Sequence, residues 1–107
     1  MAEQTPTAKA LSGRLNKILG AGTNFIEADL QSRLKALRPK DIDELNPPSI
    51  IAAGGVWTND PGFCRRLGAV LFDVSDETIE ELSVRDYQIL QAAVAANFTS
   101  YMEQDRR

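Results

Sequence analysis

The sequence predicts an all-α protein, a small bundle of about five or six short helices in a single domain. The first observation is length, since 107 residues fit one compact domain of roughly 100 to 150 residues. The second is that apolar residues recur at helical spacing along every long segment. The third is that prolines, glycines and capping residues separate these segments. We expect a disordered N-terminus at residues 1–6, a helical domain at 7–103 and a frayed C-terminus at 104–107.

The first helix is expected to extend from Thr7, which can cap it, to about Leu19. Its apolar residues share one face, and Gly20 supplies a residue that can end the helix. The expected buried face consists of Ala10, Leu11, Leu15, Ile18 and Leu19.

The second helix is expected over residues 25–37, where Pro39 marks its end. A strand is the alternative, because apolar residues of this segment also share one face at a period of two. Leu, Ala, Lys, Arg, Glu and Gln fill the segment and β-branched residues hardly occur, which favours the helix. The helical face would contain Ile26, Leu30, Leu34 and Leu37, and the strand face Ala28, Leu30, Leu34 and Ala36.

Two short segments are expected in the middle of the chain. Pro39 can open a helical turn over residues 39–45, which the proline pair at 47–48 stops. Ser49 can cap a brief apolar segment at residues 50–53 before a glycine pair breaks it.

Two helices are expected after this break. Asp60 and Pro61 form a start signal, with Asp60 as the N-cap and proline at the first helical position. Ser75 can cap a short helix over residues 76–82, whose acidic residues suit the positive end of a helix. The buried face after Pro61 would contain Phe63, Leu67, Val70 and Leu71.

The last helix is expected to begin after Ser83, which is followed three residues later by Asp86 in the spacing of a capping box. It should extend to about Met102, and the small residues at 92–96 would let another helix pack closely. One side of this helix would carry Tyr87, Leu90, Val94, Phe98, Tyr101 and Met102.

Composition excludes several kinds of catalysis. The sequence has no histidine, so imidazole general bases, Ser-His-Asp and Cys-His sites and the usual zinc sites lose their central group. We therefore expect no metal, no cofactor and no enzymatic activity. Three acid clusters could in principle supply paired carboxylates, but they lie at predicted helix starts and on solvated faces. These clusters are Asp41, Asp43 and Glu44; Asp76, Glu77, Glu80 and Glu81; and Glu103 and Asp105.

The single cysteine, Cys64, cannot form an intrachain disulfide, which is typical of a protein of the reducing cytoplasm. The neighbouring Arg65 and Arg66 could lower its pKa and make the thiol reactive. The alternative is a half-buried structural residue, which the lack of an imidazole or a second cysteine favours.

The net charge of -3 and the pI near 4.9 disfavour nucleic acid as a partner, because phosphate binding needs positive charge. The longest uncharged apolar run, residues 50–57, is far shorter than the ~20 residues of a membrane span. No apolar signal-peptide core precedes it. We expect a soluble protein with no membrane contact.

A surface for a protein partner is the remaining site that the residues suggest. Ile51, Val56, Trp57 and Phe63 could form an exposed apolar patch, since tryptophan is enriched at binding hot spots. The alternative is that Trp57 folds back onto the core as its largest side chain.

Two segments resemble a known family. Residues 74–90, closed by Phe98, resemble the C-terminal part of the tail assembly chaperones of long-tailed phages and prophages. In those proteins a short acidic segment, a leucine and an Asp-aromatic pair lead into the last helix. Residues 37–45 resemble the family's recurring Leu-Arg step. Many members open with a β-hairpin before that step, whereas the first third of this sequence predicts helices.

The resemblance implies a non-enzymatic protein that binds the aggregation-prone tape measure protein and helps recruit tail tube subunits. It would act in the cytoplasm of the bacterial host and be absent from the mature virion. Such work requires an acidic surface, exposed apolar grooves and weak self-association. The alternative function is a small helical adaptor or regulatory domain unrelated to phage, with Trp57 in its docking surface.

Overall fold

The computed structural model describes residues 5–21, 26–45 and 60–105. These residues form six helices and no strand, which confirms the all-α prediction and the helix rather than the strand in the second segment. The helices are α1 (Pro6–Gly20), α2 (Ala28–Ala36), α3 (Pro39–Glu44), α4 (Pro61–Leu71), α5 (Asp76–Glu80) and α6 (Val84–Asp105).

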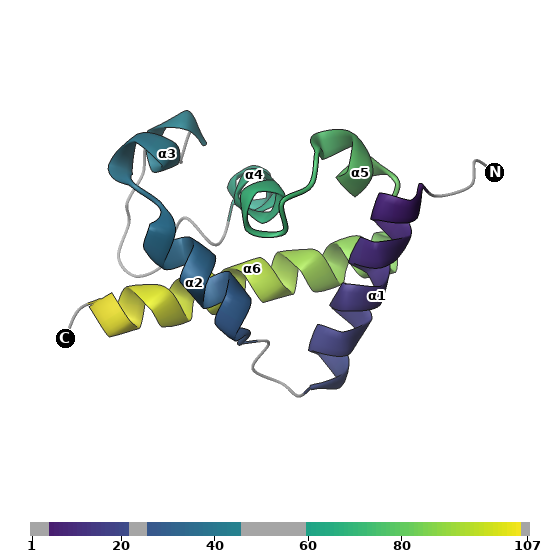
Figure 1. The fold of residues 1–107 in the computed structure, drawn as a ribbon, viewed down its shortest axis with the longest axis horizontal. Helices are drawn as coiled ribbons and strands as arrows, with labels where there is room; N and C mark the ends of the chain where they lie inside the picture. The colour runs from purple at the N-terminus through teal and green to yellow at the C-terminus, as the bar shows by residue number, and fades with distance from the viewer. Residues whose placement is uncertain (1–4, 22–25, 46–59, 106–107) are drawn as a thin grey trace.

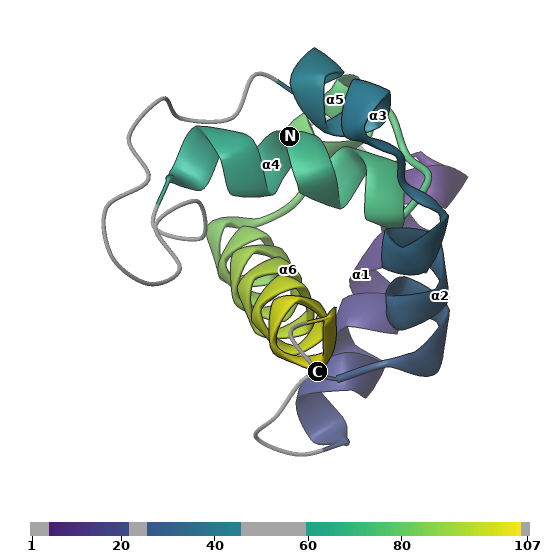
Figure 2. The ribbon, with the colours of Figure 1, turned by 90° about the vertical axis from the view of Figure 1, so that its left-hand side faces the viewer.

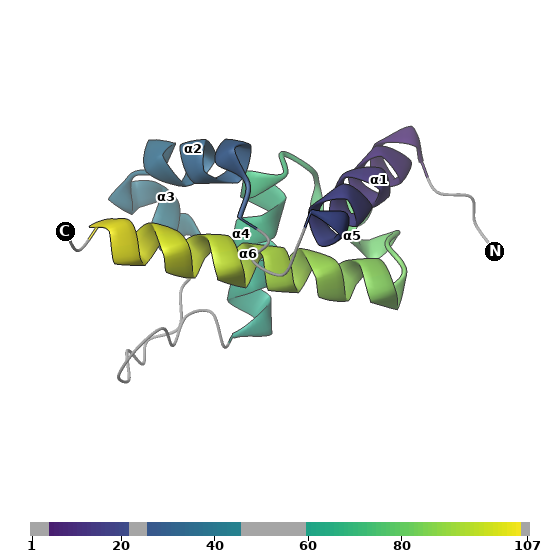
Figure 3. The same cartoon turned by 90° about the horizontal axis from the view of Figure 1, so that it is seen from below.

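The long C-terminal helix α6 is the axis of the molecule (Figure 1). Helices α1, α2 and α4 pack against it, with α4 crossing it steeply near the middle (Figure 3). Helix α3 lies beside α2, towards the C-terminal end of α6, and α5 lies near the start of α1 (Figures 1 and 2). The expected apolar segment at residues 50–53 lies outside the described residues.

The core lies where α4 crosses α6. A Cβ atom added to Gly68 of α4 would lie 2.9 Å from Leu90 Cδ2 and 3.2 Å from Val94 Cγ2, so a larger residue would force these side chains to shift. Gly68 is thus a small residue on α4 that permits close packing, and Ala93, within the small-residue stretch of α6, is fully buried. Fully or nearly fully buried core side chains include Leu15, Leu30, Leu34, Phe63, Leu67, Leu71, Leu90, Val94 and Phe98.

Helix α1 begins earlier than the sequence predicts. Its N-cap is Thr5, not Thr7: the Thr5 hydroxyl accepts the Ala8 N–H at 3.2 Å. The Thr5 N–H in turn donates to Glu81 Oε1 at 2.9 Å. Because Glu81 holds Thr5 in place, the helix starts at Pro6, inside the segment expected to be disordered.

Two of the predicted caps are present as expected. The Ser75 hydroxyl accepts the Thr78 N–H at 3.2 Å, and the Ser83 hydroxyl accepts the Asp86 N–H at 3.1 Å. The Asp86 carboxylate also accepts a hydrogen bond from Ser12 at 2.6 Å. It thereby joins α6 to α1.

The start of α2 is set by a buried amide on α6. Asn97, which is fully buried, accepts the Glu27 N–H at 3.0 Å and the Gln31 side-chain N–H at 3.2 Å. The Gln31 side-chain amide also donates to the backbone carbonyl of Asn97 at 2.9 Å. Because this contact fixes the backbone at Glu27, the helix begins at Ala28 and not at residue 25.

An arginine on α1 holds the start of α2. Arg14 pairs with Glu27 at 2.5 Å and with Asp29 at 2.9 Å. Its guanidinium also lies 4.8 Å from the centre of the Phe72 ring. The Arg14 side chain therefore links the first helix to the start of the second and also lies over the end of α4.

Several residues assigned to buried faces are exposed. The buried face of α1 consists of Ala8, Leu11, Leu15 and Ile18. At this spacing Leu19 lies at the edge of the buried face and is exposed. Helix α6 continues to Asp105, into the segment expected to fray. The exposed residues are Ala10, Leu19, Ile26, Val70 and Met102.

Candidate functional site

An apolar groove lies between the end of α2, helix α3 and the C-terminal part of α6. Its volume is about 230 Å³. Small-molecule sites typically measure about 300–1,000 Å³, so this groove suits one or two side chains of a partner better than a cofactor. The lining residues are Leu34, Leu37, Arg38, Pro39, Ile42, Phe98, Tyr101 and Met102.

The floor of the groove belongs to the core. Leu34 of α2 and Phe98 of α6 are both buried there. Phe98 rests edge-on against Phe63 of α4, with ring centres 5.8 Å apart and planes at 78°. The floor is therefore fixed by the same packing that holds the fold.

The wall formed by α3 is less deeply buried than the floor of the groove. Leu37 is in an extended conformation and ends α2 ahead of Pro39. The Asp41 carboxylate then accepts the Arg38 N–H at 2.9 Å and caps α3. Helix α3 itself contains no buried residue, and Ile42 is only half-buried.

The far end of this wall is held by Leu45 and Arg66. Leu45 is buried, and its carbonyl accepts a hydrogen bond from Arg66 Nε of α4. The wall is therefore held at its two ends and by Ile42, which packs against the core from the middle of α3.

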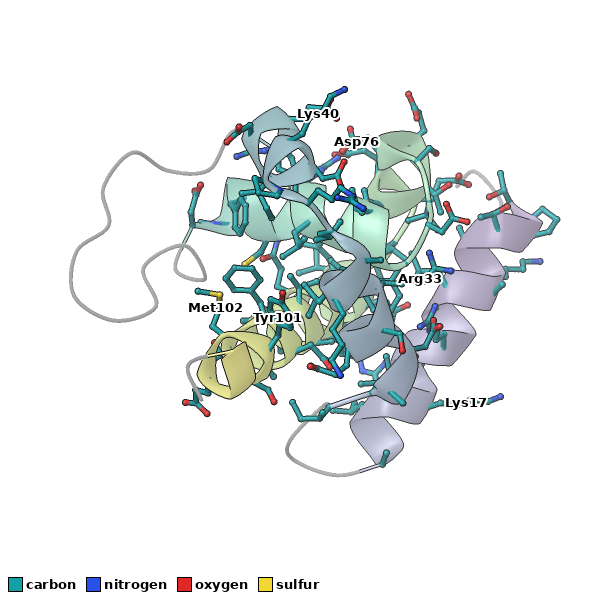
Figure 4. All side chains as sticks on the ribbon, turned by 60° about the vertical axis from the view of Figure 1, so that its left-hand side comes forward. Lys17, Arg33, Lys40, Asp76, Tyr101 and Met102 are labelled. Carbon is teal, nitrogen blue, oxygen red and sulfur yellow. The ribbon has the colours of Figure 1, made fainter. Side chains whose placement is uncertain are left out.

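The mouth of the groove is formed by side chains from the end of α6. Met102 is 46% exposed and Tyr101 is half-buried. Figure 4 shows both side chains on the side of α6 that faces the other helices. Arg38, on the opposite wall, is also exposed. The arrangement offers apolar contact inside the groove and one positive charge at its edge.

The groove is not the surface that the residues suggested. Ile51, Val56 and Trp57 lie outside the described residues, so their patch stays a prediction. Phe63 is fully buried, so it supports the floor of the groove from below and does not belong to an exposed surface. Sequence reasoning missed the groove because Met102 continues the apolar stripe of α6 and was therefore expected to be buried, whereas it is exposed.

Cys64 is a buried structural residue and is more deeply enclosed than expected. Burial raises the pKa of its thiol above the ordinary value, and the negative charge of Asp60 adds to the increase. Both effects disfavour the thiolate, the nucleophilic form. Arg65 does not activate the thiol, since it pairs with Asp76 at 2.7 Å and with Glu80.

Most described side chains of the predicted acid clusters are exposed, and Asp41 and Glu81 are half-buried. Asp76 and Glu80 are exposed and pair with Arg65. Their hydrogen bonds raise the pKa of Arg65, and that of Asp76 has the larger effect. Asp86 is the buried carboxylate, and it joins α1 to α6. Within residues 5–21, 26–45 and 60–105, no three His, Cys, Asp or Glu side chains are grouped to hold a metal ion. No helix in these ranges combines the length and apolar character that a bilayer span requires.

Comparisons with known protein families, with curated proteins and with solved structures found no match to this chain.

Proposed function

We propose that this chain is a phage tail assembly chaperone that acts by binding and not by catalysis. Its groove would hold an apolar helical segment of the tape measure protein, and the complex would help recruit tail tube subunits. Binding would take place in the host cytoplasm, and the chaperone would leave before the virion is complete.

One observation carries this proposal: the Leu-Arg step that resembles the chaperone family lines the groove together with Phe98, which closes the second resembling segment. Leu37, Arg38 and Ile42 come from the Leu-Arg step, and Phe98 closes the second segment. These residues are far apart in the sequence and line one cavity in the fold.

The construction of the groove suits a reversible binder. Phe98 and Leu34 are fixed in the core, so the floor is formed before any partner arrives. Such preorganisation lowers the entropic cost of binding. The small size of the groove limits the affinity of any one copy, which suits a chaperone that must release its client.

Co-expression tests the proposal directly. The chain should be produced with the tape measure and tail tube proteins of the same genome, and soluble tape measure protein measured with and without it. We expect more soluble tape measure protein with the chain present, and we expect the two proteins to co-purify.

Matched variants connect this result to the groove. Ile42→Asp places a charge in the groove wall and should abolish the gain in soluble tape measure protein. Val70→Asp makes the same kind of change at an exposed residue of α4 outside the groove and should preserve it. A tape measure protein that is equally soluble without the chain would refute the chaperone function and favour the adaptor.

A further inference from the structure

We infer that the groove selects an amphipathic helix that carries an apolar anchor and, within one turn of it, an aspartate or glutamate that pairs with Arg38. The inference rests on the proposed function for the identity of the partner. It adds the chemistry by which a binding segment is recognised.

Arg38 differs from the other arginines that the structure describes. Its guanidinium forms no ion pair with any described residue, although it lines the groove. Asp41, the nearest acid in the sequence that follows it, uses its carboxylate to cap the backbone N–H of Arg38. The arginines that do have carboxylate partners are Arg14, Arg33, Arg65, Arg66 and Arg85.

The surroundings of Arg38 favour a carboxylate from outside. Leu37, Pro39 and Ile42 line the same cavity, so a bound segment would exclude water from one side of the guanidinium. An ion pair is stronger where the local dielectric constant is lower than that of water. A basic segment would be repelled, so the charge provides selection as well as affinity.

A helix fits this groove better than an extended peptide. Extended peptides are commonly bound by adding a strand to a sheet edge, and the described part of the chain contains no strand. A helix in a groove inserts anchors spaced three or four residues apart. A cavity of about 230 Å³ accommodates such an anchor, and residues one helical turn apart are about 5–6 Å from each other. An acid beside the anchor would thus lie over the rim.

Peptide binding tests the inference. Overlapping peptides that cover the tape measure protein should be titrated by fluorescence anisotropy with the native chain and with Arg38→Ala and Arg38→Glu. We expect the bound peptides to share an apolar pair at helical spacing and a neighbouring acid. Affinity should fall about threefold in Arg38→Ala and roughly tenfold in Arg38→Glu, as for an ion pair at the rim of an interface.

Two controls separate charge recognition from loss of fold. Lys17→Glu reverses an exposed charge on α1, away from Tyr101 and Met102, and should leave binding unchanged (Figure 4). Replacing the acid of a bound peptide by lysine should weaken binding to the native chain and restore it for Arg38→Glu. High salt should weaken binding by the native chain more than by Arg38→Ala.

The outcomes distinguish this inference from the proposed function. Peptides that bind equally well with Asn or Gln in place of the acid would overturn the inference while the chaperone function stands. A tape measure protein that binds neither as peptides nor at full length would overturn both. Sedimentation that shows the groove closed by a second copy of this chain would also overturn the inference.

Discussion

The middle and the C-terminal end of α6 have different surroundings. In the middle of the helix the Leu90 and Val94 side chains are fully buried and face α4, whereas Tyr101 and Met102 near its end line an open groove. The difference arises from the neighbours: Gly68 brings α4 into close contact, while α3 contributes no buried residue between Pro39 and Glu44. The fold is thus anchored at the middle of the helix, and its C-terminal end lines the groove that we propose as the binding site.

Phe98 connects these two regions. It packs against Phe63 under α4 and at the same time forms the floor of the groove. A partner in the groove would therefore rest on the core itself. This arrangement lets the chain present an apolar surface without losing stability.

Val94→Asp should have the largest effect, because it places a charge at a fully buried position of the helix crossing. We expect a loss of more than ~4 kcal/mol, enough to unfold a domain of typical stability. Val84→Asp makes the same change at a residue of α6 that is 77% exposed and should stay folded. Circular dichroism during thermal melting measures both, and equal melting temperatures would contradict a buried crossing.

Asn97→Ala should be the next most damaging change. It removes the acceptor of the Glu27 N–H and of the Gln31 side chain in a buried site. Unsatisfied buried groups cost about 1–3 kcal/mol each, so we expect a loss of roughly 3 kcal/mol in urea unfolding. Asn16→Ala, at an exposed position of α1, is the matched control and should cost far less. A loss of equal size in both variants would argue against the buried network.

Gly68→Ala should destabilise the fold by about 1–2 kcal/mol, because the added methyl group would press on Leu90 and Val94. Gly13→Ala is the opposite case, since no atom lies within 4 Å of the added Cβ and the position is helical. That variant should gain up to ~1 kcal/mol. Melting temperatures that move in the same direction would mean that α4 and α6 are not in close contact.

The smallest effect concerns Cys64. Because burial and Asp60 raise the pKa of its thiol, the folded chain favours the neutral form. The unfolded thiol ionises first, so this contribution to stability is present below the ordinary pKa of 9.0 and is lost as the pH rises through the folded value. The native chain should lose more stability than Cys64→Ala above that pH. Iodoacetamide should also label native Cys64 far more slowly than the unfolded thiol.

Local signals predicted the elements well and long-range contacts poorly. Ser75 capped its helix as expected because the cap needs only the three residues that follow. The choice of Thr5 over Thr7 depends on Glu81, and the start of α2 depends on Asn97. Neither partner is visible in the local sequence.

The groove could not be predicted for a related reason. Met102 continues the apolar stripe of α6, and spacing alone cannot reveal that no described helix covers it. Arg38 belongs to the Leu-Arg step of the sequence. The sequence does not show that its guanidinium lacks an ion pair to a described residue, because the nearby Asp41 carboxylate caps the backbone instead. The fold class follows from helical spacing, whereas the site follows from tertiary contacts.

We expect the C-terminal end of α6 at the groove to bind the partner, and the middle of α6, where α4 crosses it, to hold the fold. The most direct test measures tape measure capture and melting temperature for Met102→Gln and Val84→Gln, two polar substitutions at exposed positions on the same helix. We predict that Met102→Gln weakens capture by more than about fivefold, or ~1 kcal/mol, with an unchanged melting temperature. Val84→Gln should alter neither. Undiminished capture by Met102→Gln, or an equal loss in both variants, would contradict the claim.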